Sequence, residues 1–214
     1  KKEKGARHRA DKEETKFKIT PGYIIAWIAI LIYHGAKHGG QIMLYWEEEP
    51  YGDTCAQIQN TMSRNAFEFI RRYIHFEDNA RGKDRRHKDF DPLFKIRHVL
   101  TKVMRGIQKG WIAGRRVTVD ESMIKYMGKA ISFVQYMPLK PIKHGIKVFA
   151  LCCAYTAYLL NFEVYLGKEY SKDGGSAVNV IDRLIVEADL HTQRGRIAFT
   201  DNWYTSVDLA NIYM

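Results

Sequence analysis

Apolar residues recur at helical spacing in the first half of the chain. This spacing predicts helices over about Pro21–Gly35, Ser63–Phe76 and Pro92–Lys109. Glycines at the end of the first helix place His34 and His38 in a loop, so the two are not expected to bind a metal on one helix face. The apolar stripe of the third helix is expected to pack into the core.

From Arg115 onward the apolar pattern becomes that of strands. Strands are expected at residues 116–120, 132–137, 145–154, 158–166 and 196–201, with helices at about 176–189 and from 206 onward. Strands followed by a helix, a further strand and a helix form the order of an RNase H-like domain, a mixed sheet flanked by helices. The sequence therefore predicts a mixed α/β fold. It divides the chain into a basic flexible arm (residues 1–18), a helical region (19–114) and an RNase H-like core (115–214).

Two of the expected strands end in an aspartate. Asp120 closes the run that begins at Arg116, and Asp201 closes the run that begins at Arg196; both runs have the composition of buried strands. A carboxylate at the end of a buried strand is costly unless a partner such as a metal ion compensates it. Two such carboxylates on neighbouring strands could hold Mg²⁺ or Mn²⁺ for two-metal phosphoryl transfer. An ordinary turn or a helix N-cap would also explain either aspartate.

Charge is distributed unevenly along the chain, whose formal net charge is +10. Between Pro92 and Phe162 the only acids are Asp120 and Glu121, against 12 lysines and arginines, so this span carries the whole excess. A basic field around isolated carboxylates is typical of an enzyme that acts on a polyanion such as DNA. A surface that serves solubility alone more often mixes the two signs.

The longest apolar run and the cysteines limit the class of protein. Tyr23–Tyr33 is too short to span a bilayer, so a buried helix and no membrane partner are expected. Three cysteines without a CxxC pair form neither a disulfide framework nor a zinc motif. Reduced cysteines are typical of a cytosolic or nuclear protein.

Local sequences go further than the pattern. Four blocks in the second half resemble the piggyBac transposase family in order and spacing: Val119–Met123, Tyr136–Pro141, Lys143–Val148 and Thr200–Ser206. Shorter matches at residues 19–21, 62–67 and 76–78 extend the resemblance over residues 18–214.

The resemblance implies a DNA transposase that cuts and pastes DNA at TTAA targets, with an RNase H-like core and a two-metal mechanism. Asp120 and Asp201 match the family's first two catalytic aspartates, so both are expected to bind Mg²⁺ or Mn²⁺. The family's third aspartate and its cysteine-rich zinc-binding tail lie further downstream than Met214. The core is therefore expected to be truncated and unable to cut DNA by itself. The resemblance also implies transposon ends as partner, a homodimer formed through the helical region, and a nuclear location.

Basic and aromatic residues near the matching blocks are the candidate DNA contacts. They are Lys140, Lys143, Lys147, Arg115, Arg116 and Trp203. Simple solvation of Lys140 and Lys143 is an equal alternative, and Trp203 could instead belong to the core. At the level of function, the alternatives are a domesticated, non-catalytic DNA-binding protein derived from a transposase, and a decayed element without a selected function.

Overall fold

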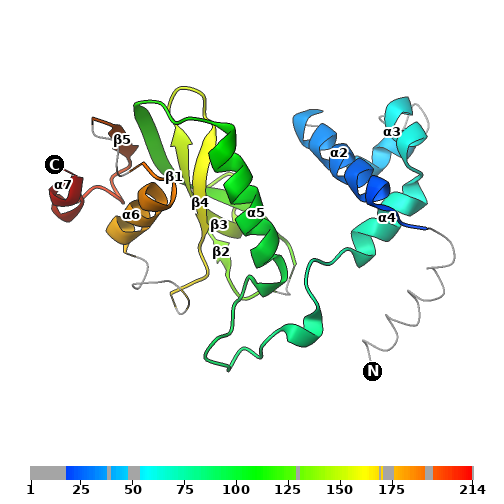
Figure 1. Ribbon diagram of the computed structural model, residues 1–214, viewed down its shortest axis with the longest axis horizontal. Helices are drawn as coiled ribbons and strands as arrows, with labels where there is room; N and C mark the ends of the chain where they lie inside the picture. The colour runs from blue at the N-terminus through cyan, green and yellow to red at the C-terminus, as the bar shows by residue number, and fades with distance from the viewer. Residues whose placement is uncertain are drawn as a thin grey trace. The chain divides into compact units, whose positions relative to one another are not determined.

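The computed structural model describes residues 18–37, 40–47, 54–128, 131–168, 170, 176–190 and 195–213. Apart from Lys18, the arm expected at residues 1–18 lies outside the described residues, as does His38. The chain forms two compact units that divide between His75 and Phe76 (Figure 1).

The N-terminal unit is helical. Its elements are α2 (Pro21–Lys37), the 3-10 helix η1 (Ile42–Trp46), α3 (Ala56–Thr61) and α4 (Arg64–Tyr73). Ser63 caps α4, because its hydroxyl accepts the Ala66 amide at 3.3 Å. The core of this unit contains Tyr45, Ile58 and Phe67.

Helix α2 continues past Gly35 to Lys37, so the expectation that His34 lies in a loop is wrong. A glycine inside a helix costs only about 1 kcal/mol relative to alanine, which packing can offset. Here the His34 ring lies edge-on to Tyr45, and Nδ1 is 3.1 Å from the buried Tyr45 hydroxyl. These contacts hold the last turn of α2 in helical form.

The second unit contains every strand found among the described residues. Its elements are η2 (Asn79–Arg81), α5 (Phe94–Gly110), β1 (Arg116–Lys125), β2 (Val134–Tyr136), β3 (His144–Cys153), β4 (Leu159–Val164), α6 (Ala177–Glu187), β5 (Ile197–Thr200) and α7 (Val207–Tyr213). Each strand expected from the sequence is therefore present, as are the two helices around β5. The expectation that Asp120 closes its strand is wrong, because β1 continues to Lys125 through its pairing with β3.

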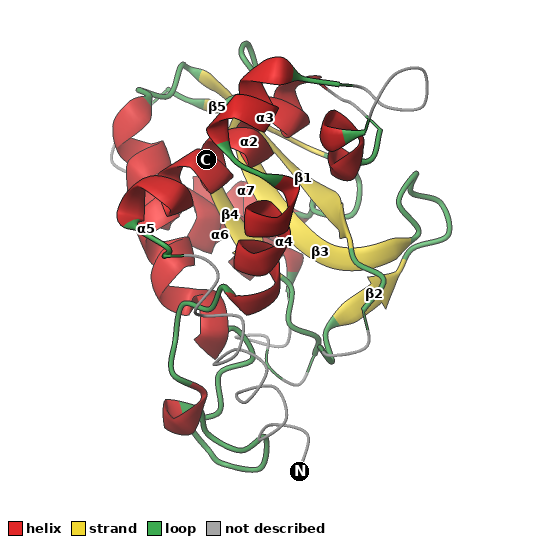
Figure 2. Cartoon of the chain, turned by 90° about the vertical axis from the view of Figure 1, so that its right-hand side faces the viewer, coloured by secondary structure: helices red, strands yellow, loops and turns green. Residues whose placement is uncertain are grey.

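The strands form one mixed sheet (Figure 2). The order is β2-β3-β1-β5, and β4 also pairs with β3. β1 runs antiparallel to β3 and parallel to β5. This arrangement confirms the expected mixed α/β fold and is consistent with a truncated RNase H-like core.

One face of the sheet forms the core of this unit. Val117 and Val119 point into it from β1, and Phe149 and Leu151 do so from β3. Helix α6 covers these residues with buried side chains that include Val180, Ile181 and Leu184. The alternation along β1 leaves Asp120, between Val119 and Glu121, exposed.

Strand β5 differs from the expected buried strand. Ile197 and Phe199 are 38% and 49% exposed, so that expectation is wrong for residues 197–200. The physical reason is position: among the described residues β5 pairs with β1 alone and forms an edge of the sheet.

Helix α5 also departs from expectation. Of its described residues none is buried, and Ile96 and Val103 are 39% and 47% exposed, so its apolar stripe is not the core element expected. The helix belongs with the sheet rather than with the helices before it. The Tyr158 hydroxyl donates to the Ile107 carbonyl at 2.9 Å, and the Gln108 side chain donates to the Glu187 carbonyl at 2.9 Å. The compact units thus divide 39 residues earlier than the sequence boundary after residue 114.

Two observations bear on the class of protein. Among the described residues, no helix combines the length and the hydropathy that crossing a membrane requires. Cys55, Cys152 and Cys153 are free thiols.

Candidate metal and DNA site

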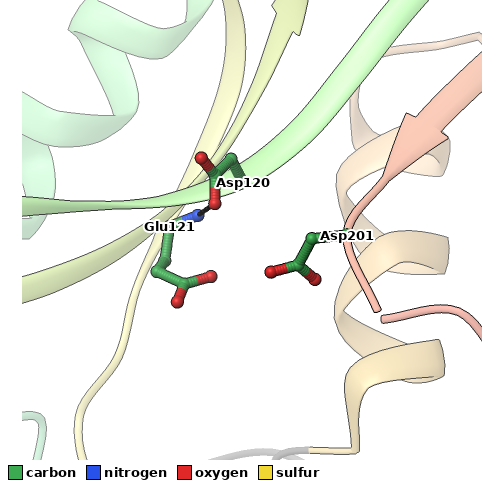
Figure 3. A group of neighbouring side chains, drawn as sticks. All are labelled: Asp120, Glu121 and Asp201. Carbon is green, nitrogen blue, oxygen red and sulfur yellow. Dashed lines mark hydrogen bonds between the residues drawn. The ribbon is translucent and has the colours of Figure 1, made fainter. Parts of the chain in front are cut away.

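The pairing of β1 with β5 brings the two aspartates together. The strands are parallel and in register from Arg116 opposite Ile197 to Val119 opposite Thr200, and Asp120 and Asp201 are the next residues on each. One carboxylate oxygen from each aspartate and one from Glu121 lie within 4.8 Å of one another (Figure 3). The expectation that the two aspartates lie within reach of a common ion agrees with this geometry.

Backbone hydrogen bonds orient both aspartates. Asp201 Oδ1 accepts the amides of Trp203 and Tyr204 at 3.0 and 3.3 Å, as a turn-forming aspartate does. Asp120 Oδ1 accepts the Glu121 amide at 2.7 Å. The turn alternative is therefore correct for Asp201, but it does not compete with metal binding, because the turn aims the carboxylate at Asp120.

Glu121 is the third carboxylate of the cluster, and the sequence reasoning gave it no role. Its side chain is 12% exposed, whereas that of Asp120 is 64% exposed. Glu121 Oε2 accepts the hydroxyl of fully buried Tyr204 at 3.3 Å. Burial and then the negative charge of Glu121 raise the pKa of Tyr204, so the phenol stays neutral and donates. The available signal was that Glu121 is, with Asp120, one of only two acids in a long basic span.

Two lysines lie beside the carboxylates. Lys140 Nζ is 3.8 Å from Asp120 Oδ1 and 3.7 Å from Glu121 Oε1. Lys147 Nζ lies 4.8 Å from the centre of the Phe149 ring and 5.0 Å from that of Trp203. Burial lowers the pKa of Lys147, and the attraction of Glu121 opposes this shift.

Trp203 forms the aromatic edge of the site. Its ring is parallel to Phe149 within 5° at 6.0 Å, and Tyr204 meets it edge-on at 4.6 Å. The Trp203 side chain stays 51% exposed, so the core alternative is wrong for Trp203 and describes its buried neighbour Tyr204 instead. An exposed, rigidly held indole beside a cation is a suitable platform for a nucleobase.

The structure does not bring the remaining expected DNA contacts to this cluster. Arg115 Nε donates to the Gly195 carbonyl at 2.9 Å, and the Arg116 guanidinium lies 5.5 Å from the centre of the Tyr155 ring. Arg116 precedes Asp120 by four strand residues, a separation of about 13 Å along β1. Lys143 is exposed in the loop between β2 and β3.

The cluster suits a hard divalent cation. Its three potential donors are carboxylate oxygens, the ligands that Mg²⁺ and Mn²⁺ prefer. Asp120 and Asp201 are exposed, which leaves room for the water or phosphate oxygens that Mg²⁺ usually keeps among its ligands.

The chain resembles known transposases along most of its length. A family model described as Transposase IS4 matches residues 4–213. A human protein, PiggyBac transposable element-derived protein 2, is 28% identical over 192 residues, which cover 86% of this chain and 30% of that protein. A solved structure described as a piggyBac transposase synaptic complex with hairpin DNA matches the fold with a TM-score of 0.76 at 24% identity, over 92% of this chain and 40% of that one.

The chain thus spans less than half the length of either of these relatives. The family match implies a divalent metal, in agreement with the carboxylate cluster. The chain belongs to the Transposase IS4 family, and it is similar to a piggyBac transposase and to a piggyBac-derived protein.

Proposed function

We propose that this chain carries part of the DNA-processing centre of a cut-and-paste transposase that acts at TTAA targets. Asp120 and Asp201 hold Mg²⁺ or Mn²⁺, and the lysines and Trp203 beside them bind the DNA to be cut. The observation that carries the proposal is the meeting of Asp120, Glu121 and Asp201 within 4.8 Å, just beyond the last paired residues of the parallel strands β1 and β5.

Each group at the site has a separate task in this proposal. When bound, the metal ion supplies Lewis-acid stabilisation of the charge on the reacting phosphate. Asp201 is aimed by its turn, and Asp120 by the rigid β1 backbone, so both carboxylates are preorganised. Lys147, partly desolvated over its aromatic rings, offers a positive charge to the phosphate backbone. Trp203 offers its exposed face to a base.

Glu121 is less available to a metal than the two aspartates. Its carboxylate already accepts the Tyr204 hydroxyl and lies beside the Lys140 ammonium. Two aspartates hold a second ion poorly, because Mg²⁺ demands near-octahedral geometry. We therefore expect the 214-residue chain to bind metal and DNA without cutting DNA by itself.

A second candidate function is DNA binding without catalysis, in a domesticated descendant of a transposase. It is supported by the human relative, whose printed name describes a transposable element-derived protein. A homodimer formed through the helical region and a nuclear location are part of both candidates.

A cleavage assay tests whether the chain binds DNA and whether it cuts DNA by itself. Duplex DNA that carries TTAA and matched element ends is incubated with the chain and Mg²⁺ or Mn²⁺, and both strands are followed on a denaturing gel. We expect binding without nicking, and binding that weakens as salt rises. Nicking that disappears in Asp120→Asn would contradict this expectation and show that an acid within this chain completes the site. Binding that ignores both salt and Asp120→Asn would contradict the proposal in either form.

A further inference from the structure

The Lys140 ammonium forms ion pairs with two carboxylates of the cluster. Lys140 Nζ is 3.8 Å from Asp120 Oδ1, 3.7 Å from Glu121 Oε1 and 3.5 Å from the Glu121 carbonyl oxygen to which it donates. Two of the three carboxylates that form the candidate metal centre therefore share this one ammonium.

We propose that Lys140 is an exchangeable counter-ion of this cluster. It neutralises the carboxylates before metal binds, leaves when a divalent cation arrives, and then contacts the phosphate backbone of DNA. The inference rests on the proposed function, because it assigns a regulation to the same metal site.

Electrostatics makes the two cations competitors. An ion coordinated by Asp120 at about 2.1 Å would lie within about 6 Å of Lys140 Nζ in its present position. A divalent ion and an ammonium at that separation repel each other even at the dielectric constant of water, by an amount that corresponds to about tenfold in affinity. The ion and the resting lysine therefore oppose each other, and movement of the lysine relieves the repulsion.

The attachment of Lys140 is weak enough to be exchanged. All three of its contacts lie at 3.5–3.8 Å, near the long limit for hydrogen bonds and ion pairs. The residue belongs to the loop between β2 and β3, where the neighbouring Leu139 is 98% exposed. Lys147, by contrast, is positioned by aromatic rings on β3 and the Asp201 turn, so it stays in place while Lys140 moves.

Exchange would couple metal binding to DNA binding. The three carboxylates carry three negative charges, of which Lys140 compensates one, so the resting cluster repels phosphate. With a divalent ion in place of Lys140, the net charge of the cluster falls from two negative charges to one, and one ammonium is freed for the DNA. Metal should therefore add one phosphate contact to the wild-type complex.

The test compares Lys140→Met with Lys143→Met, because both remove one positive charge from the same loop but only Lys140 touches the cluster. Mn²⁺ affinity is measured by calorimetry or electron paramagnetic resonance on the full chain, after circular dichroism has shown that both variants fold. Lys140→Met should bind Mn²⁺ about tenfold more tightly than wild type. Lys143→Met should match wild type, and Lys140→Arg, which keeps the charge, should stay weak.

DNA binding tests the second half of the exchange. With Mn²⁺, the slope of log affinity against log salt should steepen by about 0.9 in wild type and in Lys143→Met, the value of one phosphate contact, but not in Lys140→Met. Equal Mn²⁺ affinities in the Lys140 and Lys143 variants would overturn the counter-ion role. An equal steepening in Lys140→Met would overturn the release to DNA.

Failure of the inference can be told apart from failure of the proposed function. If Asp120→Asn abolishes Mn²⁺ binding but Lys140→Met leaves it unchanged, the metal site stands and the exchange is wrong. If Asp120→Asn binds Mn²⁺ as tightly as wild type, both the proposed metal site and the exchange are wrong.

Discussion

The two ends of the segment over which β1 pairs with β5 carry similar residue types but are built differently. At its start, Arg116 lies over the Tyr155 ring and Arg115 donates to a carbonyl. At the end of the neighbouring β5, Lys147 lies over Trp203 beside the carboxylates of Asp120 and Asp201. Basic side chains and aromatic rings occur in both places, yet among the described residues only the second place combines them with a carboxylate cluster.

The comparison teaches that a basic residue in a basic span is not by itself a site. β1 and β5 run parallel, and Asp120 and Asp201 follow the last paired residues, Val119 and Thr200, so the two carboxylates converge at one end of the paired segment. Arg116 and Ile197, the pair that opens the segment, bring no carboxylate to the other end. Function is therefore expected at the end that carries the carboxylates.

The largest expected effect is on metal binding. Asp120→Asn or Asp201→Asn should weaken Mn²⁺ binding by more than about 100-fold, because loss of even a residue behind the ligands costs about 10- to 100-fold. The amide keeps the shape and removes the charge. Asp208→Asn is the matched control, since Asp208 is an exposed acid on α7 outside the cluster. Calorimetry measures the affinities, and an equal loss in the control would break the comparison.

The next effect concerns the two exposed tryptophans. Trp203 and Trp111 are 51% and 42% exposed, and each stacks on a neighbouring ring. Trp111 follows α5, near the start of β1, so it belongs to the opposite end of the strand. Trp203→Ala should weaken binding to DNA with an unpaired terminal base by about 5- to 150-fold, the value of one stacked base.

Fluorescence of 2-aminopurine at the unpaired position reports the stacking directly. Wild type and Trp111→Ala should quench it, and Trp203→Ala should not. Equal behaviour of the two variants would mean that exposure of an indole, not its place beside the carboxylates, decides base binding.

A smaller effect follows from the Tyr204–Glu121 hydrogen bond. Tyr204→Phe should lower the free energy of unfolding by about 1 kcal/mol near neutral pH, as expected for one hydrogen bond to a charged acceptor in a partly solvated site. The pKa of Tyr204 is raised in the folded state, so its contribution is complete below about pH 10 and declines as pH rises above that value. Urea unfolding at pH 7 and pH 11 should therefore show a larger decline in wild type than in Tyr204→Phe. An equal decline in both would show that the buried phenol is not coupled to the cluster.

Much of this site was accessible from the sequence. Asp120 and Asp201 could be found because each ends a strand-like run and matches a family block, and the order of the strands then makes them neighbours. Glu121 could not be assigned, since alternation along a strand predicts that adjacent side chains point to opposite faces. In the structure, the turn after Asp201 places the Tyr204 hydroxyl where it donates to Glu121. The Glu121 carboxylate therefore lies at the same site as the carboxylates of the two aspartates.

Exposure was the least predictable property. The apolar composition of residues 197–200 and of α5 predicts burial, but composition does not say whether a strand lies at the edge of a sheet or how much of a helix its neighbours cover. The same limit applies to Trp203, for which the sequence favoured the core over the surface, whereas in the structure Tyr204 fills the buried position and Trp203 is exposed.

The smallest expected effect distinguishes Lys147 from Arg115 and Arg116, the basic residues near opposite ends of the segment over which β1 pairs with β5. If Lys147 contacts phosphate, Lys147→Met should reduce the slope of log affinity against log salt by about 0.9, which corresponds to a three- to fourfold change in affinity between 50 and 200 mM salt. Arg115→Met and Arg116→Met should leave the slope within error of wild type, because these side chains are engaged by the Gly195 carbonyl and the Tyr155 ring away from the carboxylates. Fluorescence anisotropy with a labelled duplex of arbitrary sequence at four salt concentrations gives each slope. A flattened slope in the arginine variants would extend the DNA path along the whole of β1 and remove the asymmetry. If the slope in Lys147→Met equals that of wild type, DNA is bound by basic residues outside the cluster. Lys147 would then serve only to offset the charge of Glu121 and the aspartates.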